Sequence, residues 1–523
     1  MKRKNIFSIG LLTAALGISS MSCSDYLDIN TNPNYMAEAS LPNLLPSIEA
    51  GTMAYWALSG MQVGELWMQV ATQGNTTNQY NTTVAYNLNT TSYATFWNAY
   101  SIQLEDIKML LPEAEAQGAW NYWLIAKVLQ AYNFHLLTDW YEDIPFTEAL
   151  NAEYPNPKYD SSKTVVYPGI ITLLDEAIAK ENDAKNIANA TLTISNQDYF
   201  FGGDISKWVA FAKSLKLKVL MRDFAANQAA IQSLLNAGGL LEEDCKFTAF
   251  TDATDKGNPL YEYNIRQLNT TENIRACQTM VEYLLAYGDP RIADFYEITT
   301  AAQRRITAGE VLTDREKYAG ISAGARPSSD TNGDNPIPLV NSSKYKQAYD
   351  DPFYLMNDAE VFFQVAEAWA RLGDKAKAKA AYDQGVTNAF ARWNRDASSF
   401  IGEGGAYAFD DTSLDSMLKC ILLQKWISYA KANAWDSVTD RNRTGYPKLT
   451  TIEYVRVSNM GPDYSLTEGY ELGTLVTPET SALGAGEFPR RLLTPTASSD
   501  YNPNAPEPKA LTAPMWWQVP AGQ

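Results

Sequence analysis

Apolar residues recur every three or four positions along several long segments of the chain, which is the period of an amphipathic helix. Four segments show this spacing: 120–137, 205–224, 361–372 and 418–429. A stripe of this kind buries one side of a helix against its neighbours. The pattern therefore predicts a mainly α-helical protein. The stripes consist of Leu124, Val128, Ala131 and His135; Trp208, Phe211, Ala212, Leu215 and Val219; Phe362, Val365, Ala366, Trp369 and Leu372; and Leu418, Ile421, Leu422, Trp426 and Tyr429.

One pair of helices has recognisable start and stop signals. Asn357 and Glu360 have the spacing of a capping box, Gly373 is a typical helix end, and Asp374 can cap a following helix at once. The helix that ends there and the next one, 375–389, resemble one tetratricopeptide repeat. Small residues let two such helices approach and an aromatic ring fills the gap. The residues in question are Ala378, Tyr382 and Gly385.

Polar, loop-like tracts lie between the helices and follow them. They cover 74–95, 252–273, 305–350 and a tail, 444–523, that is rich in Pro, Gly, Thr and Ser. None of them divides the chain into separate halves. We expect one domain, 23–523, in which tetratricopeptide-like helices carry an irregular loop-rich face with few short strands.

The N-terminus is typical of a targeting segment. Lys2, Arg3 and Lys4 precede a short apolar stretch, which is too short to span a bilayer and favours a signal peptide over residues 1–22. Ser22 and then Cys23 follow, as at the cleavage site of a bacterial lipoprotein. Met21 and Ser20 depart from the usual lipobox, so an unlipidated signal peptide stays as an alternative to lipidation of Cys23.

Charge and composition exclude several functions. The chain carries 42 Lys and Arg against 60 Asp and Glu, a net charge of −18, so it should repel polyphosphates and nucleic acid. It has a single histidine, His135, which argues against a histidine-built metal site. We interpret His135 as a core residue and expect no cofactor and no metal. The segment 330–335 resembles a calcium loop only superficially, because its glycine is one position early.

The cysteines are few and have no metal-binding spacing. Besides Cys23, the chain has Cys245, Cys277 and Cys420. A disulfide between Cys245 and Cys277 and buried free thiols are both open, and the second interpretation is favoured.

Short motifs along nearly the whole of 23–523 resemble one known family. They are Cys23-Ser-Asp-Tyr-Leu-Asp-Ile-Asn with Asn32-Pro33-Asn34, Leu137-Thr-Asp-Trp-Tyr-Glu-Asp-Ile-Pro145, Phe201-Gly-Gly-Asp204 with Trp208 and Ser214-Leu-Lys-Leu, Gly288-Asp-Pro-Arg291, Glu360 to Gly373, Gln424-Lys-Trp426, Arg443-Thr-Gly-Tyr-Pro447 and Phe488-Pro-Arg490. In this order they resemble the SusD/RagB family of nutrient-binding lipoproteins of Bacteroidetes, in its second SusD-like branch. Two positions depart from it: Glu142 replaces a Gly, and Asn442 replaces the first Arg of a pair.

The resemblance implies a fold and a role. It implies tetratricopeptide-like helices, a lipid anchor in the outer membrane and a position facing the cell exterior. It implies docking on a SusC-like TonB-dependent transporter, to which the protein delivers an oligosaccharide, or a peptide or another nutrient. The family motifs are mostly structural, so they assign no ligand-binding residue.

Candidate ligand-binding residues come instead from the polar tracts, where aromatic rings and planar polar groups alternate. Rings provide flat surfaces for sugar C–H groups, and amide or guanidinium groups bind hydroxyls. The same groups suit a peptide backbone. The candidates are Asn75, Asn78, Tyr80 and Tyr86 in the first tract, Tyr261, Tyr263, Arg266 and Asn273 in the second, and Arg326, Asn335, Tyr345 and Tyr349 in the third.

A surface glycoside hydrolase is the competing class. Such an enzyme uses two carboxylates separated by about 5 to 10 Å, a property of the fold that sequence spacing does not reveal. The chain has no nucleophile motif, so we favour a non-catalytic binding protein.

Overall fold

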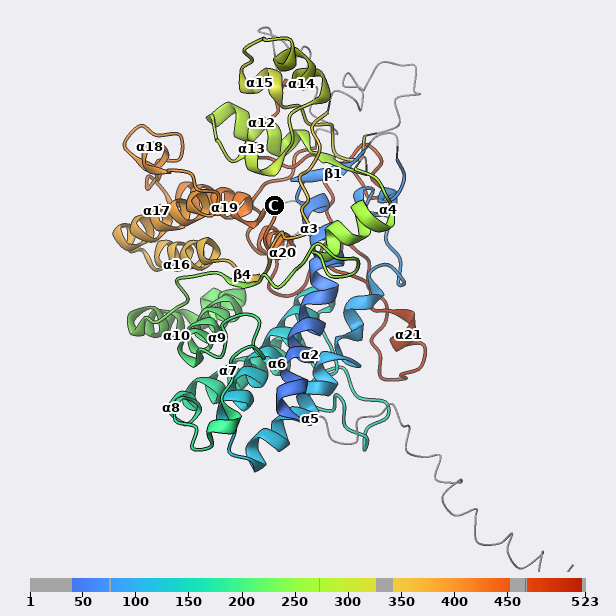
Figure 1. The fold of residues 1–523 in the computed structure, drawn as a ribbon, viewed down its shortest axis with the longest axis vertical. Coiled ribbons are helices and arrows are strands. Elements are labelled where there is room, and N and C mark those ends of the chain that lie inside the picture. Colours follow the sequence, from blue (N-terminus) through green and yellow to red (C-terminus); the bar gives the residue numbers. More distant parts are fainter. Residues whose placement is uncertain are drawn as a thin grey trace, which may run out of the picture.

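The computed structural model describes residues 40–74, 77–271, 273–325, 342–451, 466 and 468–519. Helices dominate this part of the chain, as predicted (Figure 1). The first half contains α2 (Leu41–Tyr55), η1 (Trp56–Gly60), α3 (Met61–Trp67), α4 (Asn81–Val84), η2 (Ala94–Ala99), α5 (Gln103–Ala116), α6 (Trp120–Tyr141), η3 (Ser162–Val166), α7 (Tyr167–Ala179), α8 (Glu181–Lys185), η4 (Ala190–Leu192), α9 (Ile205–Leu220), η5 (Met221–Asp223) and α10 (Phe224–Ala237).

The second half alternates short and long helices. It contains α11 (Pro259–Tyr261), η6 (Glu262–Gln267), α12 (Gln278–Tyr287), α13 (Ile292–Phe295), α14 (Thr300–Thr307), α15 (Asp314–Lys317), α16 (Asp358–Leu372), α17 (Lys375–Ala391), α18 (Ser398–Ile401), α19 (Leu414–Tyr429), α20 (Ala434–Thr444) and α21 (Thr496–Ser499). Two small antiparallel sheets join distant segments. β1 (Ala71–Gln73) pairs with β3 (Ile274–Ala276), and β2 (Cys245–Phe247) pairs with β4 (Phe353–Met356).

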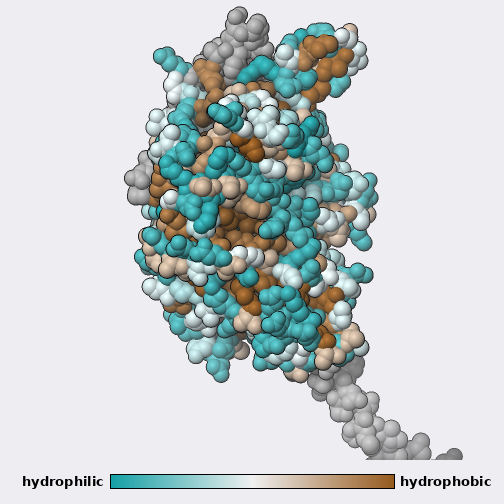
Figure 2. Space-filling view, turned by 90° about the vertical axis from the view of Figure 1, so that its left-hand side faces the viewer, coloured by the Kyte–Doolittle hydropathy of each residue, from teal (hydrophilic) through white to brown (hydrophobic). Residues whose placement is uncertain are grey.

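The long helices stack as neighbouring pairs along one side of the molecule (Figure 1). Helix α6 packs on α5, α7 and α9, and α16 packs on α17 and α19. α6 is buried on nearly all sides, which makes it a central helix of the stack. Seen from the side of α8, α10 and α17, the surface is mostly hydrophilic around a central apolar area (Figure 2). Among the half-buried apolar residues of α10 and α16 are Phe224, Leu235 and Val365.

The predicted helix pair is present, with two corrections. Asn357 caps α16 by accepting the N–H of Glu360 at 2.9 Å, but the Glu360 carboxylate accepts from Gln364 and Asn433 and does not complete a capping box. The predicted stripe of α16 was also misplaced, because Phe363 is fully buried while Phe362 is only half-buried. The reason is that α17 and α19 pack on α16 and cover the face of α16 that lies between them.

Small residues between α16 and α17 have the role expected of them. A Cβ at Gly385 would lie 2.9 Å from the ring of Phe363, closer than real side chains approach. Gly373 ends α16 with φ 85°, and Asp374 caps α17 by accepting the N–H of Lys377 at 3.0 Å. The helix predicted over 205–224 is shorter than expected, since α9 ends at Leu220 and Asp223 caps a new helix, α10.

The sequence motifs meet in a buried network of charged side chains. Arg443 forms a bidentate pair with Glu367, with both N···O distances 2.6 Å, and its Nη2 also donates to Asp440 at 2.8 Å. Lys425 Nζ lies 2.6 Å from Asp440. These residues come from α16, α19 and α20, so the motifs stabilise the stack of helices.

The lone histidine belongs to a second buried cluster. His135 is fully buried, as predicted, and its Nε2 lies 3.0 Å from Asp139 Oδ2. Arg222 and Tyr167 also bind this carboxylate, at 2.5 Å each. Burial alone would raise the pKa of Asp139, but the Arg222 guanidinium and His135 outweigh it and hold the pKa well below its ordinary value. The histidine is therefore a structural residue.

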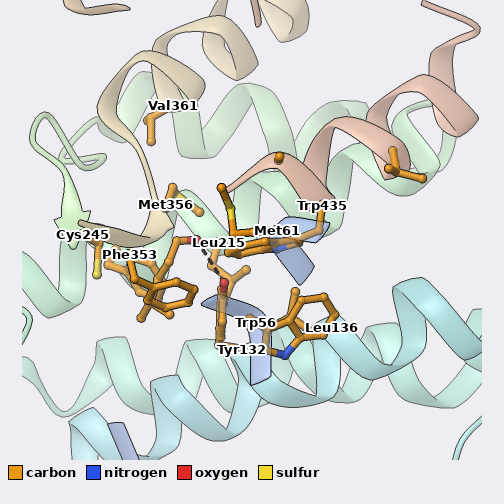
Figure 3. Packing of buried hydrophobic residues seen from close by; sticks show 14 of the residues in the cluster. Trp56, Met61, Tyr132, Leu136, Leu215, Cys245, Phe353, Met356, Val361 and Trp435 are labelled. Atoms are coloured by element: carbon orange, nitrogen blue, oxygen red, sulfur yellow. Dashed lines mark hydrogen bonds between the residues drawn. The ribbon is translucent and has the colours of Figure 1, made fainter. Parts of the chain in front are cut away.

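Aromatic residues fill the core where the loop-rich side meets the helices. Trp56 stacks on Phe96 with 4.1 Å between ring centroids and contacts Trp435 at 5.5 Å. Tyr132 of α6 points at β4 and donates its hydroxyl to the carbonyl of Leu355 at 3.1 Å (Figure 3). Cys245 and Cys277 are buried free thiols, the favoured interpretation, and Cys420 is a half-buried free thiol.

Candidate functional site

The three polar tracts meet at the short helical segment formed by α11 and η6. Asn258 starts this segment, because its side chain accepts the N–H groups of Leu260 and Tyr261 and Pro259 occupies the first helical position. The backbone N–H of Asn258 donates to the carbonyl of Tyr349 at 2.7 Å, which joins the second tract to the third. The segment adjoins the residues that precede α4, on the side of the molecule away from α10 and α17 (Figure 1).

Half-exposed aromatic and cationic groups lie on this segment. The Tyr261 and Tyr349 rings are 6.3 Å apart and inclined by 72°. The guanidinium of Arg266 lies 5.6 Å from the centre of the Tyr261 ring. Gln79 Nε2 donates to the Tyr263 hydroxyl at 2.8 Å, and Asn78, next to it, is exposed. We call Asn78, Gln79, Tyr261, Tyr263, Arg266 and Tyr349 the tyrosine cluster.

Buried polar groups hold the tyrosine cluster from below. Asn264, on the inner side of η6, accepts the Tyr80 hydroxyl and donates to Gln347 at 2.9 Å. Burial raises the pKa of Tyr80, which keeps its hydroxyl protonated as a donor. The three tracts are thus joined by side-chain hydrogen bonds around one asparagine.

Two carboxylates at the tyrosine cluster are already occupied. Arg266 forms ion pairs with Asp252 and, at 3.2 Å, with Glu262. Glu262 also accepts the backbone N–H groups of Asp255 and Gly257, each at 3.1 Å. Both acids are therefore bound as acceptors and position the Arg266 guanidinium.

Several predicted residues do not present a surface to a ligand. The rings of Tyr80, Tyr86 and Tyr345 are 4%, 1% and 4% exposed, so the expectation of exposed stacking platforms fails for them. Tyr86 packs edge-on against Trp67, with centroids 6.0 Å apart, and Tyr345, in the third tract, lies in the core. Asn273 is 7% exposed, and its carbonyl accepts the N–H of Gly74 at 2.9 Å.

The other predicted residues divide into two groups. The first group comes together in the structure and consists of Tyr261, Tyr263, Arg266 and Tyr349, with Asn78 beside them. The sequence prediction omitted Gln79, which lies in the first tract and contacts Tyr263. Cys23, Asn75, Arg326 and Asn335 lie outside the described residues, as does the segment 330–335 that resembles a calcium loop.

Two classes of site are not found in the part of the chain that the structure describes. It contains no group of three or more His, Cys, Asp or Glu residues placed to bind a metal ion. None of its helices combines the length and the apolar character needed to cross a bilayer.

Comparison with known proteins decides the family. The family model described as "Starch-binding associating with outer membrane", SusD-like, matches residues 33–462. This chain belongs to the SusD-like family. The family associates with the outer membrane, and its members include proteins described as nutrient-binding. No curated protein matches the chain.

Solved structures of SusD-like proteins have the same fold. A Bacteroidetes SusD-like protein named AC2a is 20% identical, and the match covers 92% of this chain and 100% of that one with a TM-score of 0.69. A SusD homologue from Bacteroides uniformis is also 20% identical over 92% and 100%, with a TM-score of 0.63. A protein described as chitin-binding is 20% identical over the same shares, with a TM-score of 0.67.

Proposed function

We propose that this protein is a non-catalytic cell-surface lipoprotein that binds an oligosaccharide and delivers it to a SusC-like TonB-dependent transporter. The observation that carries the proposal is the tyrosine cluster, where half-exposed rings, amides and a guanidinium from three distant tracts lie together. Aromatic surface rimmed by polar groups is typical of a binding site. Membership of the SusD-like family supports the outer-membrane location.

The absence of catalysis is part of the proposal. Hydrolysis of a glycosidic bond needs one carboxyl group to donate a proton and another to act as base or nucleophile. Asp252 and Glu262, two acids at the tyrosine cluster, are both ion-paired with Arg266. A carboxylate held in this way orients the guanidinium of Arg266.

The proposal also includes lipidation of Cys23 and a transporter partner. These two parts rest on family membership and on the sequence of the N-terminal leader. A lipid on Cys23 would tether the chain ahead of α2, which begins at Leu41. In this proposal the ligand binds to the loop-rich side, where hydrogen bonds join the three tracts.

Calorimetry on the purified full-length chain tests the ligand class. The titrants are neutral oligosaccharides, including starch and chitin fragments, and mixed peptides of similar length. We expect at least one glycan to bind and Tyr261→Ala and Tyr263→Ala to weaken it about tenfold, since a stacked ring contributes roughly 1 kcal/mol beyond its buried area. Tyr501→Ala is the matched control, because that ring is 83% exposed and belongs to another part of the chain.

The outcomes separate the alternatives. Binding of peptides alone would assign the protein to peptide capture, and release of shorter sugars during the titration would make it an enzyme. Glycan binding that is equally strong in both tyrosine variants would place the site elsewhere.

A further inference from the structure

A buried glutamate lies beneath the loop that carries one ring of the tyrosine cluster. Glu65 is 3% exposed and belongs to α3, which packs on α20 near the centre of the molecule (Figure 1). One of its carboxylate oxygens accepts the backbone N–H of Lys431 at 2.7 Å. The other oxygen and the neighbouring Tyr345 hydroxyl are both buried, and neither has a hydrogen-bond partner among the described residues. Buried polar atoms are usually paired, so a change in the charge of Glu65 acts directly on these neighbours.

Lys431 joins Glu65 to this loop. Its ammonium group is buried and donates to the Lys346 carbonyl at 2.7 Å and to the Asp351 carboxylate at 3.0 Å. These two acceptors are the ends of the 346–351 loop. One lysine therefore fixes the loop through its side chain and contacts Glu65 through its backbone.

Hydrogen bonds tie the 346–351 loop to the tyrosine cluster. The loop contains Tyr349, whose carbonyl accepts the N–H of Asn258 at 2.7 Å. The Asn258 side chain donates to the carbonyl of Asp351 at 2.9 Å and also starts α11. Gln347 accepts from Asn264 of η6 at 2.9 Å. A shift of this loop therefore changes the position of residues that form the cluster.

A small cavity lies between Lys431 and the start of α11. Its volume is about 20 Å³, and its lining includes Asn258, Tyr345, Asp351 and Lys431. Roughly 10 to 15 Å³ is enough for one water molecule. These side chains therefore have room to change partners without unpacking the core.

Two charged groups act most strongly on Glu65, and both belong to this arrangement. They are Lys431 and Asp351, and the phenols of Tyr345 and Tyr296 also lie near. The segments η1, α4 and β1, which pack on α3, contain no titratable side chain. The charged side chains of α20 have other partners: Asp436 pairs with Lys218, Arg443 with Glu367 and Asp440, and Arg441 lies over Phe488.

The charge of Glu65 changes near neutral pH. Burial, opposed by Lys431 and Tyr345, raises the pKa of Glu65 from 4.5 to about 7. The carboxyl is therefore mostly neutral at about pH 6 and mostly ionised at about pH 8.5. Once ionised, it and Asp351 are two carboxylates beside one ammonium group, and they repel each other. Asp351 is the one that can move, because its side chain is 27% exposed while Glu65 is buried.

We propose that protonation of Glu65 holds the 346–351 loop in the arrangement that binds ligand, so that the tyrosine cluster loses affinity as Glu65 ionises. This inference rests on the proposed function and concerns the regulation of the same site. With a neutral Glu65, the ammonium group of Lys431 belongs to Asp351 and the Lys346 carbonyl. An ionised Glu65 competes for it and releases the loop, and a released loop must be ordered again when ligand binds.

Hydrogen exchange followed by mass spectrometry on the full-length chain tests the loop without any ligand. We expect the amides of 346–351 and of Asn258 to exchange about threefold to tenfold faster at pH 8.5 than at pH 6, after correction for the intrinsic rate. In Glu65→Gln, which stays neutral, the corrected rates should be equal at both pH values.

Glu49→Gln is the matched control. Glu49 is a second buried acid whose pKa is raised by burial, and it accepts the N–H of Tyr199 at 2.7 Å, outside the arrangement around Lys431. Its replacement removes one buried carboxyl from the core in the same way. Glu49→Gln should therefore keep the pH-dependent exchange of the unmodified chain.

Calorimetry with maltohexaose and chitohexaose at the same two pH values tests the effect on binding. We expect a probe that binds to do so about threefold to tenfold more weakly at pH 8.5, since one pKa unit of difference between the free and bound chain corresponds to a factor of ten. Glu65→Gln should bind equally at both pH values, and Glu49→Gln should follow the unmodified chain.

The inference is overturned if the loop of the unmodified chain exchanges equally at both pH values, a result that needs no variant. It is also overturned if Glu65→Gln keeps the difference, or if a glycan binds the unmodified chain with the same affinity at both pH values. If the loop responds to pH through Glu65 but neither glycan binds, the proposed function fails for these sugars, while control of the loop by Glu65 is supported.

Discussion

Glu367 is the residue whose charge we expect to matter most for the stability of the helical stack. Its carboxylate is fully buried and holds Arg443 by two hydrogen bonds of 2.6 Å, with Arg371 at 2.8 Å. The substitution Glu367→Gln keeps the size and shape of the side chain and removes its charge. It leaves the Arg443 guanidinium, which is also buried, with one anionic partner, Asp440.

The magnitude follows from the pKa of this carboxyl. Burial alone would raise the pKa of Glu367, but Arg443 and Arg371 outweigh it and lower the pKa from 4.5 to about 2. Each unit corresponds to 1.36 kcal/mol, so ionisation of Glu367 contributes about 3 kcal/mol to the free energy of unfolding at neutral pH. Breaking a buried ion pair costs roughly 3 to 5 kcal/mol, which agrees. For a chain of this length we expect a fall in Tm of about 3 °C.

Thermal and urea unfolding at several pH values measure the effect. A carboxyl with a lowered pKa stabilises the fold above its unfolded pKa, and this contribution is lost as the pH falls from about 4.5 toward 2. The difference between the unmodified chain and Glu367→Gln should therefore be full at pH 7 and shrink below pH 4.5. Glu176→Gln is the control, since Glu176 forms a half-exposed pair with Lys127 at 2.9 Å and should change stability by less than about 1 kcal/mol. Equal stability of both variants at pH 7, or a difference that is undiminished at pH 3, would refute the reasoning.

Three further predictions concern other parts of the chain. Burial raises the pKa of Glu65 to about 7, although the backbone N–H of Lys431, which donates to its carboxylate, lowers it. The native chain should therefore lose stability as the pH rises from 4.5 through 7. Glu65→Gln should abolish that loss in pH-dependent urea unfolding. Gly385→Ala should destabilise the α16–α17 contact by about 1 to 3 kcal/mol in the same assay, because its Cβ would meet the Phe363 ring at 2.9 Å. Cys23→Ala should move the protein from the membrane fraction to the soluble fraction, and a variant that stays in washed membranes would contradict lipidation.

The fold was largely predictable because helical periodicity is a local property. The helix predicted over 120–137 is α6. Asn357 and Asp374 start their helices and Gly373 ends one, as their chemistry suggests. What failed was the choice of face on α16. Phe362 and Phe363 are equally apolar, and which of them is covered depends on α17 and α19, that is, on packing between helices.

The sequence predicted which tracts contribute to the candidate site, but not which residues of each tract face solvent. Tyr261, Tyr263, Arg266 and Tyr349 lie together because the α11–η6 segment touches the third tract, a long-range contact. Tyr80 has the same local sequence character, yet its ring is buried and its hydroxyl supports Asn264 from within. A polar neighbourhood in sequence therefore does not distinguish a ring that faces solvent from one that supports the site.

One of the two motif residues that depart from the family pattern shows how the loop-rich part is fixed to the helices. Glu142, where the family has Gly, ends α6 with φ 72°, a backbone conformation that favours glycine. Its carboxylate accepts from Arg491 at 2.8 Å and from Lys509, so the strained residue is held by ion pairs to the C-terminal segment. The same principle applies at the tyrosine cluster, where buried hydrogen bonds fix three loops. Loops that are already fixed lose little entropy when a ligand binds, which supports the proposed binding of a flexible oligosaccharide at this surface.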